Sequence, residues 1–185
     1  MHRLVAHGLQ RQAFVSGGFM AEETNALHEL LVDELKDLYN AENQIIKALP
    51  RMARKAANPE LRRAFESHLE ETRTQAERLE QIAEEMDFSL RGKKCKGMEG
   101  LLEEGKEVMQ EFEEDTLDAG MIGAAQKVEH YEIAGYGTAR THANLLGLKK
   151  VAKLLQQTLD EEARTDKKLS SLAENVVNLE ALQEA

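Results

Sequence analysis

The sequence is poor in the residues on which disulfide-rich proteins and β-sheet proteins depend. Its 185 residues include 1 cysteine, 2 prolines, no tryptophan and only 4% aromatic residues. Cys95 has no second cysteine with which to form an internal disulfide, so nothing in the sequence calls for an oxidising compartment, and we expect a cytoplasmic protein. β-Sandwiches and β-barrels usually contain more aromatic residues and turn breakers than this sequence has, so both fold classes are disfavoured.

Basic residues and long apolar runs are also lacking. Lys and Arg number 24 against 34 Asp and Glu, which gives a formal net charge of −10. Binding to nucleic-acid phosphates needs clustered Lys and Arg, so we expect no nucleic-acid partner. No apolar run reaches the roughly 18 residues of a membrane-spanning helix, so we expect no membrane partner either.

What the sequence does contain is typical of one helical domain. It is rich in Ala, Leu, Glu, Lys and Gln, which are good helix formers, and its length fits a single domain of roughly 100–200 residues. Residues 1–20 contain no Asp or Glu, whereas acidic residues are frequent from Glu22 onward. We interpret residues 1–20 as an extension that the fold does not need, with a short targeting or membrane-surface segment as the alternative. We expect the domain to span residues 21–178 and a C-terminal tail to occupy residues 179–185.

Four long segments show apolar residues at helical spacing, and they cover about residues 22–52, 59–86, 117–146 and 148–176. Asn58-Pro59 separates the first pair and Gly147 separates the second, so each pair is expected to form an antiparallel hairpin. About thirty residues join the two hairpins, and they include a short acidic helix at about 98–114. Two short loops and one long crossover are typical of the ferritin-like four-helix bundle, so we predict an all-α fold of that kind.

Several glutamates lie where these helices are expected to be apolar. Turning each residue by about 100° places Glu42 inside the apolar stripe of the first helix and Glu162 inside that of the last. Glu132 is at the centre of the stripe at 117–146, with Glu129 about 60° away. A carboxylate in an apolar stripe is destabilising unless a positive group or ion pairs with it, so these glutamates are the informative residues.

The predicted topology brings these carboxylates to one level of the bundle. Glu132 and Glu162 are equally far along the chain from the turn that joins their helices, so they are expected to face each other. At the level of Glu42, the second helix offers two further candidate ligands, His68 and Glu71. Carboxylates from four helices with a histidine close by are the ingredients of a two-metal carboxylate site.

We therefore predict a centre that holds two iron or manganese ions per chain, with the ligands Glu42, His68, Glu71, Glu129, Glu132 and Glu162. The alternative is that these glutamates reach solvent, pair with Arg73 or Lys127, or face a dimer contact.

Five stretches of the chain carry a family resemblance: residues 31–56, 58–82, 94–105, 127–147 and 159–169. Through them the sequence resembles the YciE/YciF family of bacterial stress-associated ferritin-like proteins, over about residues 24–176. The resemblance implies a ferritin-like bundle, a homodimer and a role in stress response, and it implies no firmly assigned reaction.

The chain departs from ferritins, bacterioferritins and manganese catalases in its ligand motifs. Those families carry Glu-x-x-His on the second and fourth helices, and the motif occurs nowhere in this chain. A nitrogen ligand is still offered by His68, whereas the last helix offers only the acidic residues Glu161, Glu162 and Asp166. A ligand set made mostly of carboxylates suits iron or manganese, but ferroxidase activity does not follow from it.

Two functions remain open from the sequence. The glutamates in the apolar stripes favour a di-metal oxidoreductase that handles peroxide, dioxygen or iron. The missing Glu-x-x-His motifs favour a non-catalytic dimer that acts as a structural or partner-binding stress protein, with partners that the sequence does not identify.

Cys95 lies in a glycine-containing segment beside Lys94 and Lys96. We interpret it as an exposed linker thiol, with oxidation sensing as the alternative because nearby positive charge favours a thiolate.

Overall fold

The computed structural model of the protein describes residues 17–183, which form six α-helices and one π-helical segment. The helices are α1 (Gly17–Lys55), α2 (Pro59–Glu85), α3 (Lys96–Glu111), α4 (Glu114–Leu145), α5 (Lys149–Leu172) and α6 (Asn178–Gln183), and the π-helical segment η1 (Ala173–Val177) joins α5 to α6. Residues 1–16, which make up most of the predicted extension, lie outside the described part of the chain.

Polar side chains fix the turn between α1 and α2. Asn58 caps α2 by accepting hydrogen bonds from two backbone N–H groups of its first turn, and Pro59 follows at the first helical position. From α4, the buried carboxylate of Asp118 accepts hydrogen bonds from the backbone N–H groups of Ala57 and Asn58, at 3.0 and 2.6 Å. The helix boundary predicted at Asn58-Pro59 is therefore confirmed.

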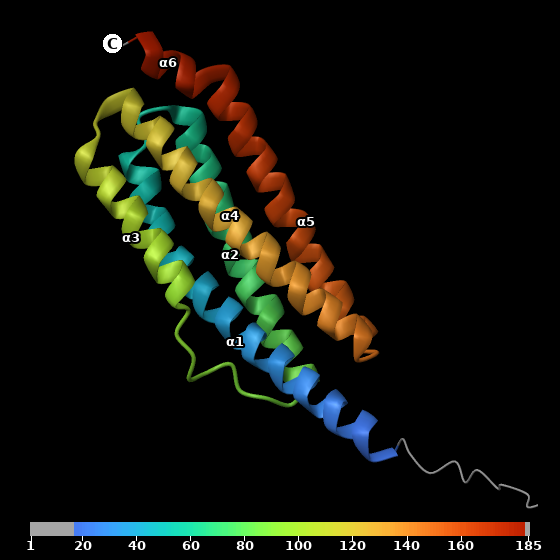
Figure 1. Ribbon diagram of the computed structural model, residues 1–185. Helices are drawn as coiled ribbons and strands as arrows, with labels where there is room; N and C mark the ends of the chain where they lie inside the picture. The colour runs from blue at the N-terminus through green and yellow to red at the C-terminus, as the bar shows by residue number, and fades with distance from the viewer. Residues whose placement is uncertain (1–16, 184–185) are drawn as a thin grey trace, which may run out of the picture.

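The long helices pack as two antiparallel hairpins, α1–α2 and α4–α5, joined by a long crossover (Figure 1). Gly147, with a φ of +73°, makes the tight turn between α4 and α5, a backbone conformation that glycine adopts without strain. The crossover carries α3, which packs against α4 and α1. This is the arrangement predicted from the loop lengths.

The core consists of two apolar clusters with polar residues between them. One cluster includes Ile45, Phe65, Met121 and Leu169, and the other includes Leu35, Leu79, Tyr136 and Leu155. On each of the four long helices, buried polar side chains lie between the residues of the two clusters. We call this set the polar layer, and it consists of Glu42, His68, Thr72, Gln75, Glu129, Glu132, Thr158 and Glu162.

The interpretation of Cys95 as an exposed linker thiol is wrong. Its side chain is fully buried, its Sγ lies 3.0 Å from the Tyr131 hydroxyl, and it caps α3 by accepting from the Met98 N–H. The segment before it lies against α1, because Asn40 accepts from the Cys95 N–H and Gln44 donates to the Cys95 carbonyl. Burial raises the pKa of the thiol, so the nearby lysines do not produce a thiolate.

The last part of the chain is more helical than predicted. α5 ends at Leu172, before the predicted position 176, but the chain continues through η1 into α6, which packs against α4. Residues 179–183 of the predicted tail therefore belong to a helix. None of the described helices has the length and apolar character needed to cross a membrane.

Candidate metal centre

Four glutamates and a histidine are buried together in the polar layer. Glu42 and Glu162 are 0% exposed, Glu129 and Glu132 are 1% exposed, and His68 is 6% exposed. They come from α1, α2, α4 and α5, so all four helices of the bundle contribute. Glutamate is almost never fully buried unless something pairs with it, so this concentration of acidic groups requires a physical explanation.

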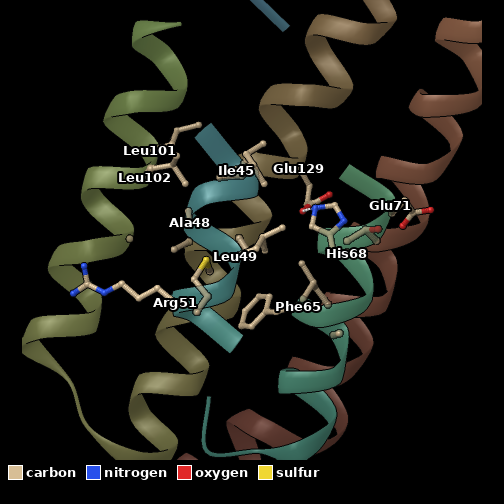
Figure 2. Close-up of a pocket in the computed structure, with 18 of the residues that line it drawn as sticks. Ile45, Ala48, Leu49, Arg51, Phe65, His68, Glu71, Leu101, Leu102 and Glu129 are labelled. Carbon is tan, nitrogen blue, oxygen red and sulfur yellow. Dashed lines mark ion pairs between the residues drawn. The ribbon is translucent and has the colours of Figure 1, made fainter. Parts of the chain in front are cut away.

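Three of these side chains converge on one point. A nitrogen of His68 and carboxylate oxygens of Glu132 and Glu162 all lie within 4.8 Å of one another. The Nε2 atom of His68 also lies 3.2 Å from Oε1 of Glu129, so a fourth side chain adjoins the group. Figure 2 shows His68 and Glu129 side by side, on α2 and α4 respectively.

The converging atoms lack hydrogen-bond partners in the described part of the chain. Both oxygens of Glu132, both ring nitrogens of His68, and one oxygen each of Glu42, Glu129 and Glu162 are buried without a hydrogen bond. His68 Nε2 is close to Glu129 but not aligned for a hydrogen bond with it. Buried polar atoms are normally paired, so these orphaned atoms point toward a group that would bind them.

Among the described residues, no lysine or arginine forms an ion pair with the buried glutamates of the layer, and Arg78 reaches the layer only through a hydrogen bond to Thr158. Two of the nearby basic side chains bind acidic groups nearer the surface, in the pairs Arg78–Glu161 at 2.7 Å and Arg164–Glu71 at 3.3 Å. The two cations named as alternative partners in the sequence analysis also pair elsewhere, as Arg73–Glu70 and Lys127–Glu104. Ion pairing with these residues therefore does not explain the buried glutamates.

Burial has a large effect on the protonation of the layer. It raises the pKa of Glu42 to about 8, and together with the charges of neighbouring glutamates it raises the pKa of Glu132 and of Glu162 well above the ordinary value. Burial alone would lower the pKa of His68, but the neighbouring carboxylates of Glu129, Glu42 and Glu71 together outweigh it, and the pKa is raised overall. Without added positive charge, the layer therefore holds protons at neutral pH.

Neighbouring polar groups orient some of the carboxylates. The Tyr136 hydroxyl donates a hydrogen bond to Glu42, and the side-chain amide of Gln75 donates one to Glu162. Ligands of protein metal sites are commonly held by such supporting hydrogen bonds, which fix the orientation of the ligating group.

The predicted site residues fall into two groups. Glu42, His68, Glu129, Glu132 and Glu162 come together in the polar layer. Glu71 lies nearer the surface, with its side chain 31% exposed and paired with Arg164. His130, which is adjacent to Glu129 in the sequence, is exposed and does not join the layer.

Three members of the layer were not among the predicted ligands. Thr72 and Gln75 follow His68 at the spacing of one helix face, and Thr158 precedes Glu162 by one turn of α5. The same rotation that selected the glutamates would have selected these three residues, because they share the helix faces of His68 and Glu162.

The donor set fits iron or manganese. Carboxylate oxygens with a single imidazole form a mostly hard, oxygen-rich set, and neutral imidazole also binds iron. A pair of divalent cations would supply the positive charge that four buried carboxylates lack.

Comparison with known proteins identifies the family. The family model described as "Domain of unknown function (DUF892)" matches residues 26–182, nearly the whole described chain. The chain belongs to this family. It is 48% identical over 161 residues to Protein YciF of Escherichia coli (strain K12), an alignment that covers 86% of this chain and 97% of that protein.

Solved structures agree with this assignment. The crystal structure of the E. coli stress protein YciF matches with a TM-score of 0.79 at 49% identity, over 82% of this chain and 97% of that chain. YcfI from Rhodopseudomonas palustris, a proposed structural protein, matches with a TM-score of 0.77 at 38% identity, over 85% and 98% of the two chains. The family resemblance and the predicted ferritin-like helical bundle are confirmed, and the chain is a YciF-like protein.

Proposed function

We propose that this YciF-like protein is a stress-associated metalloprotein that holds two iron or manganese ions per chain in the polar layer. The observation that carries the proposal is the convergence of His68, Glu132 and Glu162 within 4.8 Å, with buried atoms that have no hydrogen-bond partner in the described chain. The association with stress rests on the description of the E. coli relative as a stress protein.

The residues of the layer divide into ligands and supporting groups. Glu132, Glu162 and His68 are the central ligands because their atoms already converge, and Glu42 and Glu129 complete the set. Glu71 is a candidate only at the rim, where Arg164 already binds it.

When bound, two such ions would supply redox chemistry toward peroxide, dioxygen or ferrous iron. The chain itself contributes orientation and exclusion of water. Tyr136 holds Glu42, Gln75 holds Glu162, and the two apolar clusters close the layer above and below. The protons kept on Glu42, Glu132 and Glu162 by burial must leave when the ions bind, so binding is expected to strengthen as the pH rises.

A second candidate function is a homodimeric structural or partner-binding protein without redox chemistry. It is favoured by the raised pKa values, because protonated carboxyl groups can remain buried without a metal. The description of YcfI as a proposed structural protein also agrees with it. The two candidates differ in whether the purified chain binds iron or manganese.

Metal binding is tested by anaerobic reconstitution with Fe(II) or Mn(II), removal of loose metal by gel filtration, and inductively coupled plasma mass spectrometry. The wild type is expected to retain close to two ions per chain, and Glu132→Ala and Glu162→Ala are expected to lose them while circular dichroism shows intact helices. Glu77→Ala, at an exposed position of α2, is the matched control. Unchanged metal content in both site variants would refute the assignment of Glu132 and Glu162 as ligands. A wild type that binds no metal would favour the second candidate, a structural or partner-binding protein.

A further inference from the structure

An apolar cavity of about 420 Å³ lies beside the polar layer and is lined by residues of α1, α2, α3, α4 and α5. Most of its wall is aliphatic or aromatic and includes Ile45, Leu49, Phe65, Leu101 and Leu102 (Figure 2). His68 and Glu129 of the polar layer also line it. Its volume falls within the roughly 300–1,000 Å³ that is common for small-molecule sites.

The charge around this cavity is opposite in sign to that of the protein. The chain carries a formal net charge of −10, yet five basic residues line the cavity and only two acidic residues, Glu71 and Glu129, do so. The basic residues are Lys47, Arg51, Lys106, Arg164 and Lys168. A local excess of positive charge at the edge of an apolar cavity favours a ligand that carries a negative group.

Two of the three available cations are on α1. Among the described residues, Lys47 and Arg51 of α1 and Lys168 of α5 form no ion pair, whereas Arg164 is bound to Glu71 at 3.3 Å and Lys106 is bound to Glu103. Lys47 and Arg51 are four residues apart on one helix, so their side chains lie on the same face. Arg51 extends from α1 toward α3, across the side of the cavity (Figure 2).

We propose that this cavity binds an amphipathic anion, with a single apolar chain inside the cavity and a carboxylate or similar group held at its rim by Lys47 and Arg51. The apolar wall would bury the chain, and the two exposed cations would bind the anionic group. An uncharged apolar ligand would leave the cations unused, and a cationic ligand would be repelled by them. The site goes beyond the proposed metal centre and needs no ion in the polar layer.

The test is isothermal titration calorimetry with dodecanoate below its micellar concentration, on full-length protein kept metal-free with a chelator. Saturable binding with one site per chain is expected. Lys47→Glu/Arg51→Glu is expected to weaken it at least about tenfold, because two attractive ion pairs are replaced by repulsion. Lys149→Glu/Lys153→Glu makes the same charge change at exposed positions of α5 outside the cavity and is expected to bind as the wild type does.

Two further comparisons separate the cavity from a general surface effect. Ala48→Phe, which places a ring at the cavity wall, is expected to abolish binding, whereas Ala134→Phe on an exposed position of α4 leaves it intact. Dodecyltrimethylammonium, which has the same chain with a cationic group, is expected to bind at least about tenfold more weakly than dodecanoate.

Several results would overturn the proposal. These are absence of saturable dodecanoate binding, equal affinity for the anionic and cationic probes, or equal loss in the two charge-reversal variants. Sedimentation velocity without the probe tests whether a second copy of the chain occupies the cavity instead. A wild-type dimer that dissociates in Ala48→Phe, together with no dodecanoate binding, would show that a second copy of the chain covers the cavity.

Discussion

Replacing Glu132 with leucine is expected to stabilise the metal-free protein and to destabilise the metal-loaded one. The side chain of Glu132 is 1% exposed, and neither of its oxygens has a hydrogen-bond partner in the described chain. A buried polar group left unpaired costs about 1–3 kcal/mol, and burying a leucine side chain contributes about 1.5–3 kcal/mol. Imperfect packing of the new side chain costs about 1–3 kcal/mol. The net expectation is a gain of about 2 kcal/mol without metal, or a melting temperature about 4–8 °C higher.

When metal is bound, the wild type is expected to be more stable than Glu132→Leu. At a free-metal concentration of about 1,000 times Kd, each bound ion stabilises the wild type by about 4.1 kcal/mol, or roughly 8 kcal/mol for two ions, whereas a variant that binds neither ion gains nothing. The wild type is then roughly 6 kcal/mol more stable than Glu132→Leu. Glu162→Leu is a poorer test, because it leaves the amide of Gln75 without its closest acceptor.

Differential scanning calorimetry with a chelator, and again with saturating Mn(II) or Fe(II), measures both states. Glu77→Leu, at an exposed position of α2, controls for the general effect of a glutamate-to-leucine change and is expected to show no reversal. If Glu132→Leu is less stable than the wild type under both conditions, the buried carboxylate has a structural role, which would contradict the proposed metal centre.

Three further predictions concern protonation and packing. Burial raises the pKa of Glu42 to about 8 from the ordinary 4.5, and those of Glu132 and Glu162 also rise, so the folded metal-free protein keeps protons that the unfolded chain releases. Its free energy of unfolding is therefore expected to fall as the pH rises from about 4.5 to 8, by up to about 1.4 kcal/mol per pH unit for each group. Urea unfolding across this pH range measures the change. A free energy of unfolding that does not vary with pH would contradict the prediction. Asp118→Ala removes the acceptor for the backbone N–H groups of Ala57 and Asn58 and is expected to lower the free energy of unfolding by about 3 kcal/mol. Asp118→Asn is expected to lower it by less. Thermal unfolding measures both, and an unchanged melting temperature would refute this role of Asp118. Gly97→Ala would bring a Cβ to 2.6 Å from Cε2 of Tyr131, whose hydroxyl is bound to Asp37 and adjoins Cys95. The free energy of unfolding is therefore expected to fall by about 1–3 kcal/mol. Gly100→Ala on the same helix is the control because nothing lies within 4 Å of its Cβ, and equal stability of the two variants would contradict this prediction.

Much of the candidate site could be predicted because it depends on helix periodicity. Glu42, Glu132 and Glu162 interrupt apolar stripes, and a stripe fixes which side of a helix faces the core. The turns at Asn58-Pro59 and Gly147 set the level of each residue along the bundle. Together these two local features bring the residues to one layer.

Other features depend on contacts between distant segments. Cys95 is buried because the crossover runs back along α1 and bonds to Asn40 and Gln44, and no pattern around Cys95 encodes those contacts. Asp118 is likewise buried, and its function as an acceptor for the α1–α2 turn becomes visible only once α4 lies beside that turn. The pairing of Glu71 with Arg164 also requires the packing of α2 against α5.

The most direct test of the metal centre is anomalous X-ray diffraction at the iron and manganese absorption edges, from crystals of protein purified without chelators. We predict two anomalous peaks per chain inside the polar layer, within ligand distance of His68, Glu132 and Glu162. A layer without anomalous peaks after reconstitution, with the glutamates hydrogen-bonded to one another, would contradict the proposed metal centre.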